Sequence, residues 1–305
     1  MQNKISKKSI ILFGIIILAA VFIFANFDTV TKITARIINS TPNVTIPESN
    51  EYAYNYSYNY VKKSDDFIPY SKQDIINIFY SILDNGYDSF TFYCPSEYKE
   101  CLKDVEMISN NQSIITNIGN FVHPYNNFSS IKVATDSLGE VNIKVTKTYS
   151  DAKIKAINDK IDELFNLKFT SETSLEDKIL IMHDYIVDST IYDMNEENPN
   201  SGDAYGVLFD GKAKCAGYAD AMAIILDKLG VQNYKVASDE HVWNAVYLND
   251  TWKHMDLTWD DPVVTDGTNI TDTIRHKFYM IDTNTLLSYD TKEHSFDPAV
   301  YVEVN

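Results

Sequence analysis

Two neighbouring segments rich in β-forming residues place the strongest constraint on what this chain can fold into. They occupy residues 241–248 and 251–258, and Asn249-Asp250 between them is a plausible two-residue turn. With such a turn, Leu248 pairs with Thr251 and the pairing continues residue by residue away from the turn. The sequence therefore predicts an antiparallel hairpin, and a turn of three residues would shift its register by one.

The register of this hairpin decides which side chains meet. Because alternate residues of a strand share a face, Trp243 lies opposite Asp256, and His241 becomes a diagonal neighbour of Asp256. Diagonal neighbours lie roughly 7–8 Å apart at the backbone, within reach of an imidazole and a carboxylate that lean toward each other. His254 shares the same face and is the competing partner for Asp256. The shifted register would point Asp256 away from His241.

A cysteine precedes the hairpin at the start of an expected helix. Residues 211–230 read as a loop that enters a buried helix, which begins at or next to Cys215 and ends at Gly230. Unpaired backbone N–H groups and the helix dipole favour an anion in the first turn. Lys212 and Lys214 flank the cysteine. We therefore expect this environment to stabilise the thiolate of Cys215.

The three side chains match the needs of attack on an amide bond. Such attack requires a thiolate nucleophile, a base that holds its proton and later delivers it to the leaving amine, and a carboxylate that fixes the imidazole tautomer. Cys215, His241 and Asp256 fill these roles in order. The alternative interpretation is that the three are ordinary core and turn residues.

The same residues carry a resemblance to a known family. The pattern GKAKCAGYA…HVWNAV…W…DLTWDDP, between about residues 171 and 262, resembles the bacterial core domain of the transglutaminase-like superfamily. The resemblance implies an α+β, papain-like fold in which a nucleophile helix packs on an antiparallel sheet. It also implies a Cys-His-Asp triad at Cys215, His241 and Asp256, with no metal or other cofactor.

One element of the animal transglutaminases is missing. Those enzymes have a tryptophan upstream of the cysteine that supports the oxyanion, whereas all three tryptophans of this chain follow Cys215. The backbone N–H of Cys215 and the side chain of Tyr205 are the substitutes we expect. Trp243 is a further candidate, because aromatic side chains of the hairpin could wall a substrate groove, although such residues are usually core.

The expected chemistry is an acyl-thioester route on a protein or peptide amide. Water as the acceptor gives a cysteine peptidase or amidase, and an amine gives a protein transglutaminase. Hydrolysis is slightly favoured, because water is abundant and the sequence has no visible amine-binding feature. The alternative, from another class, is a catalytically silent surface or scaffold domain that binds proteins. Its usual mark is a degraded triad, which this chain does not have.

The N-terminus predicts export or anchoring. Lysines at positions 4, 7 and 8 precede an apolar run over residues 10–25. We expect residues 1–27 to be a signal anchor or signal peptide. The prediction is a single-pass membrane protein whose C-terminal domain lies outside the cytoplasm, with secretion as the alternative if cleavage follows Ala25. The membrane would then be a partner, and cell-wall components would be candidate partners besides the substrate.

Composition and spacing divide the rest of the chain. We expect a tether over residues 28–69, a small α+β support domain over 70–168 and the transglutaminase-like catalytic domain over 169–305. In the tether, five tyrosines alternate over residues 52–60, which is typical of a packed strand or a low-complexity tether and less so of a sugar- or wall-binding face. A formal net charge of −17 argues against nucleic-acid binding.

Capping residues, among them Ser71 and Ser174, and apolar spacing predict the remaining elements, and residues 136–139 predict the turn of a second hairpin. Helices are expected at residues 72–83, 97–108, 151–165 and 174–188, strands at 89–93, 130–135, 140–149 and 275–281, and a turn or short helix at 282–287. Residues 193–203 are a solvated acidic loop, with a calcium site as the alternative. Cys94 and Cys101 either form a disulfide or remain two thiols, and Cys215 is the odd cysteine in either case.

Overall fold

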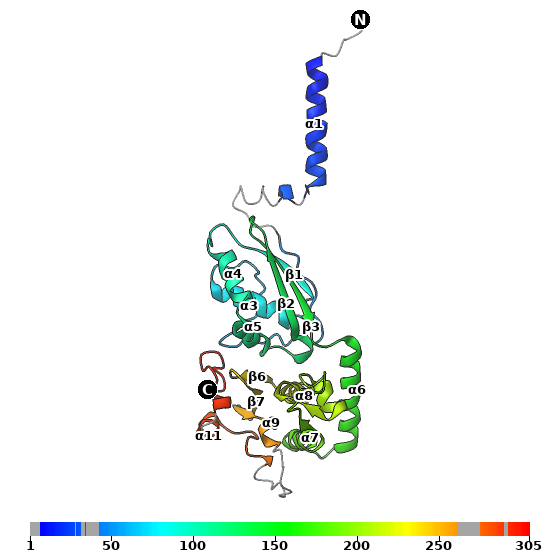
Figure 1. Ribbon diagram of the computed structural model, residues 1–305, viewed down its shortest axis with the longest axis vertical. Coiled ribbons are helices and arrows are strands. Elements are labelled where there is room, and N and C mark those ends of the chain that lie inside the picture. Colours follow the sequence, from blue (N-terminus) through cyan, green and yellow to red (C-terminus); the bar gives the residue numbers. More distant parts are fainter. Residues whose placement is uncertain (1–6, 28, 32–33, 35–42, 262–274, 290–291) are drawn as a thin grey trace.

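The computed structural model describes residues 7–27, 29–31, 34, 43–261, 275–289 and 292–305. An N-terminal helix stands apart from a folded body, in which an upper and a lower part each combine helices with an antiparallel sheet (Figure 1). The predicted α+β class is confirmed.

The N-terminal prediction needs correction. Helix α1 covers Lys7–Ala25, and among the described residues no helix has both the length and the apolar character needed to cross a membrane. At 1.5 Å per residue, its 19 residues rise about 28 Å and include two lysines at the start. A bilayer core is about 30 Å thick. The expected single-pass anchor, and contact with a membrane through it, are therefore not supported. Residues 35–42 of the predicted tether lie outside the described residues.

The upper part is built on a three-stranded antiparallel sheet in the order β1-β3-β2. Its strands are β1 (Ser89–Tyr93), β2 (Phe128–Thr135) and β3 (Glu140–Lys147), and its helices are α3 (Lys72–Asp84), α4 (Cys101–Ser109), α5 (Gln112–Gly119) and the 3-10 turn η1 (Pro124–Asn126). Ser71 caps α3 by accepting a hydrogen bond from the backbone of Asp74, as its sequence position indicated. The predicted strands and hairpin are confirmed here, and α5 is an additional helix.

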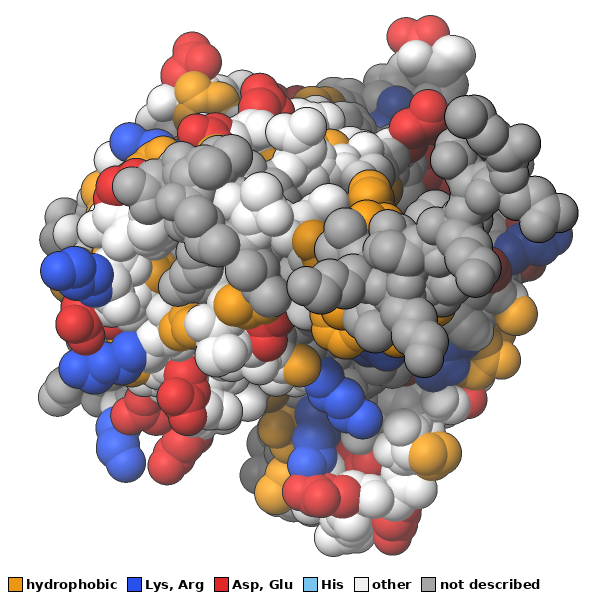
Figure 2. Space-filling view, turned by 90° about the horizontal axis from the view of Figure 1, so that it is seen from above, with side chains coloured by type: hydrophobic (Ala, Val, Ile, Leu, Met, Phe, Trp, Pro, Cys, Tyr) orange, Lys and Arg blue, Asp and Glu red, His pale blue; other side chains and the backbone are white. Residues whose placement is uncertain are grey.

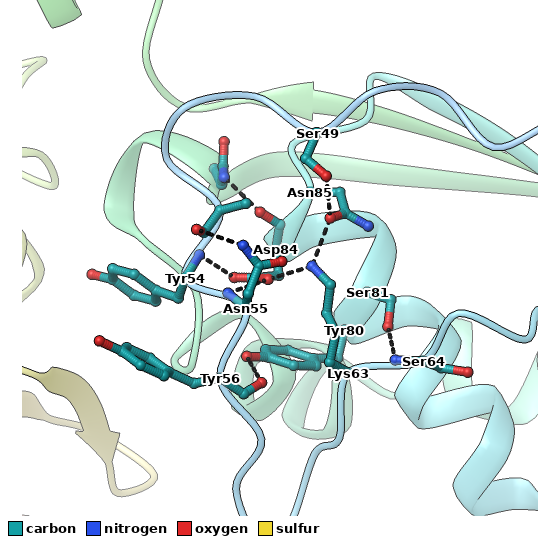
Figure 3. A network of polar contacts seen from close by, with 12 residues as sticks. Ser49, Tyr54, Asn55, Tyr56, Lys63, Ser64, Tyr80, Ser81, Asp84 and Asn85 are labelled. Atoms are coloured by element: carbon teal, nitrogen blue, oxygen red, sulfur yellow. Dashed lines mark hydrogen bonds and ion pairs between the residues drawn. The ribbon is translucent and has the colours of Figure 1, made fainter.

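The tyrosine-rich segment lies against this part without forming a strand. The backbone N–H groups of Tyr54 and Asn55 donate to the Asp84 carboxylate at 3.0 and 3.1 Å, and Lys63 Nζ forms an ion pair with Asp84 at 2.6 Å (Figure 3). The ring of Tyr58 packs edge-on against Tyr234, 5.3 Å between centroids. Residues 52–63 are therefore part of the folded body.

The lower part holds the longest helices of the folded body and the second three-stranded sheet, in the order β6-β7-β8. Its elements are α6 (Asp151–Lys168), α7 (Leu175–Ser189), β4 (Ile191–Tyr192), η2 (Gly206–Asp210), β5 (Lys212–Ala213), α8 (Cys215–Lys228), β6 (Asn233–Ala237), β7 (Val242–Leu248), β8 (Thr251–Met255), α9 (Leu257–Asp260), α11 (Thr283–Ser288) and η3 (Lys292–His294). Helix α8 packs on the sheet, where Asn244 Nδ2 donates to the carbonyl of Ala219 at 3.0 Å. This is the predicted helix-on-sheet core.

The β7–β8 hairpin has the predicted register. Leu248 pairs with Thr251, and Asn249 and Asp250 form the turn with φ of 52° and 61°. Positive φ at both turn residues is the geometry of a type I′ hairpin. The second strand ends earlier than expected, at Met255, because a short helix begins two residues later.

The strand predicted at residues 275–281 is wrong. These residues form turns, and only Ile281 makes an isolated bridge, to His254. The segment lies against the sheet edge through two mutual backbone hydrogen bonds of 2.8 and 3.0 Å between these two residues. Its apolar residues are therefore explained by packing: Phe278 is fully buried.

One hydrophobic cluster crosses the predicted boundary at residue 168. It contains Phe121 from the upper part together with Tyr234, Trp243 and Tyr301 from the lower part. The division into a support and a catalytic domain therefore remains a prediction, with a shared core between the two. Acidic and basic side chains are interspersed over the face shown in Figure 2.

Candidate active site

Cys215 is the first residue of helix α8 and a partly exposed free thiol. The remaining two cysteines, Cys94 and Cys101, form a disulfide with a Cα–Cα distance of 5.7 Å. In the first turn of α8, a Cβ on Gly217 would lie 2.6 Å from the carbonyl oxygen of Ser201. The glycine therefore lets the loop before the helix pass close to the nucleophile.

His241 connects the cysteine to the carboxylate. Its Nε2–H donates to Asp256 Oδ2 at 2.6 Å, and both side chains are buried. Cys215 lies near enough to this imidazole to raise its pKa. Burial by itself lowers the pKa of His241, but the charge and hydrogen bond of Asp256, followed by those of Cys215, raise it to about 10. The imidazole is therefore protonated at neutral pH.

Asp256 is held by four hydrogen bonds. Oδ2 accepts from His241 and, at 2.8 Å, from Nε2 of His294, while Oδ1 accepts from the backbone N–H groups of Thr258 and Trp259. Burial tends to raise the pKa of this carboxyl, but the charges and hydrogen bonds of the two histidines lower it to about 2. Because Asp256 also caps helix α9, its position is fixed by the backbone as well as by side chains.

His254, the competing base, is engaged elsewhere. Its Nδ1 accepts from Trp243 Nε1 at 2.9 Å and its Nε2 lies 3.1 Å from the hydroxyl of Thr283. Burial, followed by the charge of His294, lowers the pKa of His254 to about 3. It is a neutral core histidine, and His241 is the histidine that contacts both Asp256 and the cysteine.

The lysines beside the nucleophile lean onto the acidic loop. Lys212 forms ion pairs with Glu197 at 2.5 Å and Asp193 at 3.3 Å, and Lys214 pairs with Glu196. Their charges are thus partly balanced by this loop, so the direct support for the thiolate comes from His241 and from the helix terminus.

Tyr192 is a site residue that sequence reasoning missed. Burial raises the pKa of the Tyr192 phenol, and so do the charges of Cys215 and Glu293 and the Cys215 side chain as a hydrogen-bonding neighbour. The backbone N–H of Cys215 acts in the opposite direction and lowers this pKa. The hydroxyl therefore lies against both the thiol and the N–H of the nucleophile. The parallel pairing of Tyr192 with Ala213, two residues before the cysteine, puts it there.

The other two predicted residues lie differently. The ring of Tyr205 stacks on Phe209, 4.4 Å between centroids, and lies 5.5 Å from the Nζ of Lys153. Trp243 is fully buried, and its ring stacks on His241 at 5.7 Å. Trp243 thus packs behind the base.

A cleft of about 530 Å³ opens beside the base. It is lined by Tyr192, Met194, Glu240, His241, Thr258, Trp259, Asp261 and Glu293. Three of these residues are acidic. Burial raises the pKa of Asp261 to about 6 against the lowering effect of the Tyr218 hydroxyl, which lies 2.5 Å away.

Two groups of side chains in the described part of the chain have metal-ligand atoms within 4.8 Å of one another. They are His183, Asp184 and His276, and His241, Asp256 and His294. Hydrogen bonds within each group, such as His276 Nε2 to Asp184 Oδ1 at 2.6 Å, account for both arrangements.

Comparison with known proteins gives a family match and several similar solved structures. Residues 165–257 match the family model of the transglutaminase-like superfamily. The fold is similar to a crystal structure of a TGase (18% identity, covering 50% of this chain and 49% of that one, TM-score 0.32). It is also similar to a proposed cysteine protease from Cytophaga hutchinsonii (14% identity, 42% and 61% covered, TM-score 0.28). The chain thus spans about half of the TGase structure, and no curated protein matches it.

Proposed function

We propose, from the match of residues 165–257 to the family model of the transglutaminase-like superfamily, that the protein is a thiol enzyme acting on protein or peptide amide bonds. The observation that carries the proposal is the cluster of Cys215, His241 and Asp256, in which a protonated imidazole lies near a thiol at a helix terminus and donates a hydrogen bond to an ionised carboxylate. The disulfide supports work in an oxidising environment.

The first step forms an acyl-thioester. Cys215 Sγ attacks the amide carbonyl carbon and a C–S bond forms, while His241 delivers its proton to the nitrogen as the C–N bond breaks. Asp256 does not exchange the proton; it keeps the imidazole oriented and stabilises its charge. A water or an amine then attacks the thioester, gives its proton to His241 and releases the Cys215 thiolate.

The oxyanion of this step forms beside the backbone N–H of Cys215. The Tyr192 hydroxyl lies against that N–H. We therefore propose Tyr192, rather than Tyr205, as the side-chain donor to the oxyanion. Donors placed in advance at the position where charge develops lower the barrier.

The cleft supports a preference for basic substrates. Glu240, Asp261 and Glu293 line it beside His241. Acidic walls raise the local concentration of cationic groups. We propose that a lysine or other basic side chain of the substrate lies near these carboxylates. A substrate peptide with lysine beside the reacting amide should therefore be used faster than its glutamate counterpart, and the Glu293→Gln variant should narrow that difference. Equal rates for the two peptides would contradict the preference.

Alkylation of the purified full chain with iodoacetamide tests the nucleophile. Mass spectrometry should place the adduct on Cys215, and the rate at pH 7 should exceed that of a free model thiol. The Cys215→Ala variant is the matched control for the adduct. A rate no faster than the model thiol would refute the activated nucleophile and favour a silent scaffold domain.

Acceptor choice needs a second assay. Incubation with a glutamine peptide and a fluorescent amine, scored against peptide cleavage, separates transamidation from hydrolysis. We propose hydrolysis as the main outcome, because the partly exposed thiol is accessible to water. Incorporation of the amine as the dominant product would reverse this assignment. Cys215→Ala should lose whichever activity is found.

A further inference from the structure

The second histidine on Asp256 comes from a part of the chain that the family match does not include. His294 ends the short helix η3 (Lys292–His294), 37 residues beyond the end of the match at residue 257. Its Nε2 lies 2.8 Å from Asp256 Oδ2, the same oxygen that His241 contacts at 2.6 Å. The C-terminal segment thus reaches the centre of the site.

The imidazole of His294 is enclosed by aromatic rings. It stacks on Phe278 at 5.0 Å and contacts the rings of Trp243 and Trp259 at 5.1 and 5.0 Å. Its side chain is 1% exposed. A polar ring buried this deeply costs free energy unless its N–H groups are paired, so the hydrogen bond to Asp256 is a strong constraint on both partners.

The two histidines meet Asp256 from different directions. Their rings lie 5.5 Å apart at an interplanar angle of 88°. Two donors at such an angle, together with the two backbone donors on Oδ1, leave the carboxylate no freedom to rotate away from His241. Without His294, Oδ2 would keep one of its two donors, and the aromatic enclosure beside it would become a cavity.

We propose that His294 is a positioning residue that holds Asp256 toward His241, so that the C-terminal segment completes the catalytic machinery. The inference rests on the proposed function, since it concerns the same triad. It predicts that the catalytic centre of this protein requires residues beyond the family domain.

The charge of His241 can be followed with two reagents that alkylate the same sulfur. Iodoacetate is an anion and is attracted by the imidazolium, whereas iodoacetamide is neutral. The ratio of the iodoacetate rate to the iodoacetamide rate therefore falls as His241 loses its proton. The midpoint of the ratio is the pH at which half of this fall has taken place. Other titratable groups near Asp256, His294 and His241 include His254, Asp260, Tyr192 and Glu293. The pKa of His254 is lowered to about 3, so this imidazole stays neutral over the range in which His241 loses its proton.

The test compares His294→Ala and His294→Gln with the wild-type full chain. The glutamine amide can donate where Nε2–H did, and alanine cannot. For the alanine variant we expect the midpoint of the reagent ratio to lie at least about one pH unit lower, the effect of losing one charge-assisted hydrogen bond, and alkylation by iodoacetate to be several-fold slower at about pH 9.5, between the two midpoints. The glutamine variant should recover most of the rate and the midpoint.

The matched control is His123→Ala. His123 is also buried and paired with a carboxylate, 3.1 Å from Asp227, but its partners lie outside the site. It should lower the melting temperature without moving the midpoint. Unchanged rate and midpoint in His294→Ala, a midpoint at or above that of the wild type, or a glutamine variant as impaired as the alanine variant would overturn the inference. A wild-type Cys215 that is no more reactive than a model thiol would instead refute the proposed function itself.

Discussion

Replacing Asp256 with asparagine should remove the charge that keeps His241 protonated. The pKa of His241 lies at about 10, against 6.5 for the unperturbed side chain, although burial acts in the opposite direction. At about 1.4 kcal/mol per pH unit, this difference corresponds to roughly 5 kcal/mol in favour of the imidazolium. Asp256 contributes the larger part of it, and Cys215 the rest. Asparagine keeps the size of the side chain and removes the charge.

The ratio of iodoacetate to iodoacetamide alkylation at Cys215 measures the result. For the wild type we expect the ratio to fall with a midpoint near the His241 pKa of about 10, and for Asp256→Asn with a midpoint near or below 6.5. Tyr192 also titrates in the alkaline range, since its pKa is raised, and the His241→Ala variant separates its contribution. A midpoint that stays above about 9 in Asp256→Asn would refute the reasoning, because the charge on His241 would then have another source.

Further expectations follow from the same contacts. Tyr192→Phe should lower kcat by roughly ten- to a hundredfold with little change in KM, because the hydroxyl supports the oxyanion. Steady-state kinetics on a cleaved peptide measure both constants, and an unchanged kcat would contradict this role. Because the Asp256 pKa is lowered from 3.8 to about 2, its contribution to stability is present above pH 3.8 and is lost as the pH falls through 2. The free energy of unfolding, followed by circular dichroism, should therefore fall less steeply with decreasing pH over this range in Asp256→Asn than in the wild type. Asp250→Gly should stabilise the protein by about 0.5–1 kcal/mol in urea unfolding, because φ is 61° at this turn position; a loss of stability would contradict the I′ turn. Gly217→Ala should lower the melting temperature and slow alkylation of Cys215, because its Cβ would meet the carbonyl of Ser201 at 2.6 Å; an unchanged melting temperature would show that the loop can yield.

Local signals were sufficient for most helices and for the hairpin. Ser71 and Ser174 cap helices where the sequence indicated, because a capping side chain acts within three residues of itself. The turn at Asn249-Asp250 set the strand register for the same reason. Local signals failed at residues 275–281, where apolar residues pack against a sheet edge without joining the ladder. They also failed at Asp256, which ends β8 by capping the next helix.

The sequence by itself determined the nucleophile helix, the hairpin and the diagonal pair His241 and Asp256, since each depends on residues close together in the chain. Only the tertiary structure decided the rest of the site. Tyr192 reaches Cys215 through a two-residue parallel pairing, and His294 reaches Asp256 from 38 positions away. Neither of these two contacts is marked in the sequence by a periodic or capping pattern, because each is made by the packing of segments that are separate in the chain. His254 was likewise excluded as the base only by its bonds to Trp243 and Thr283.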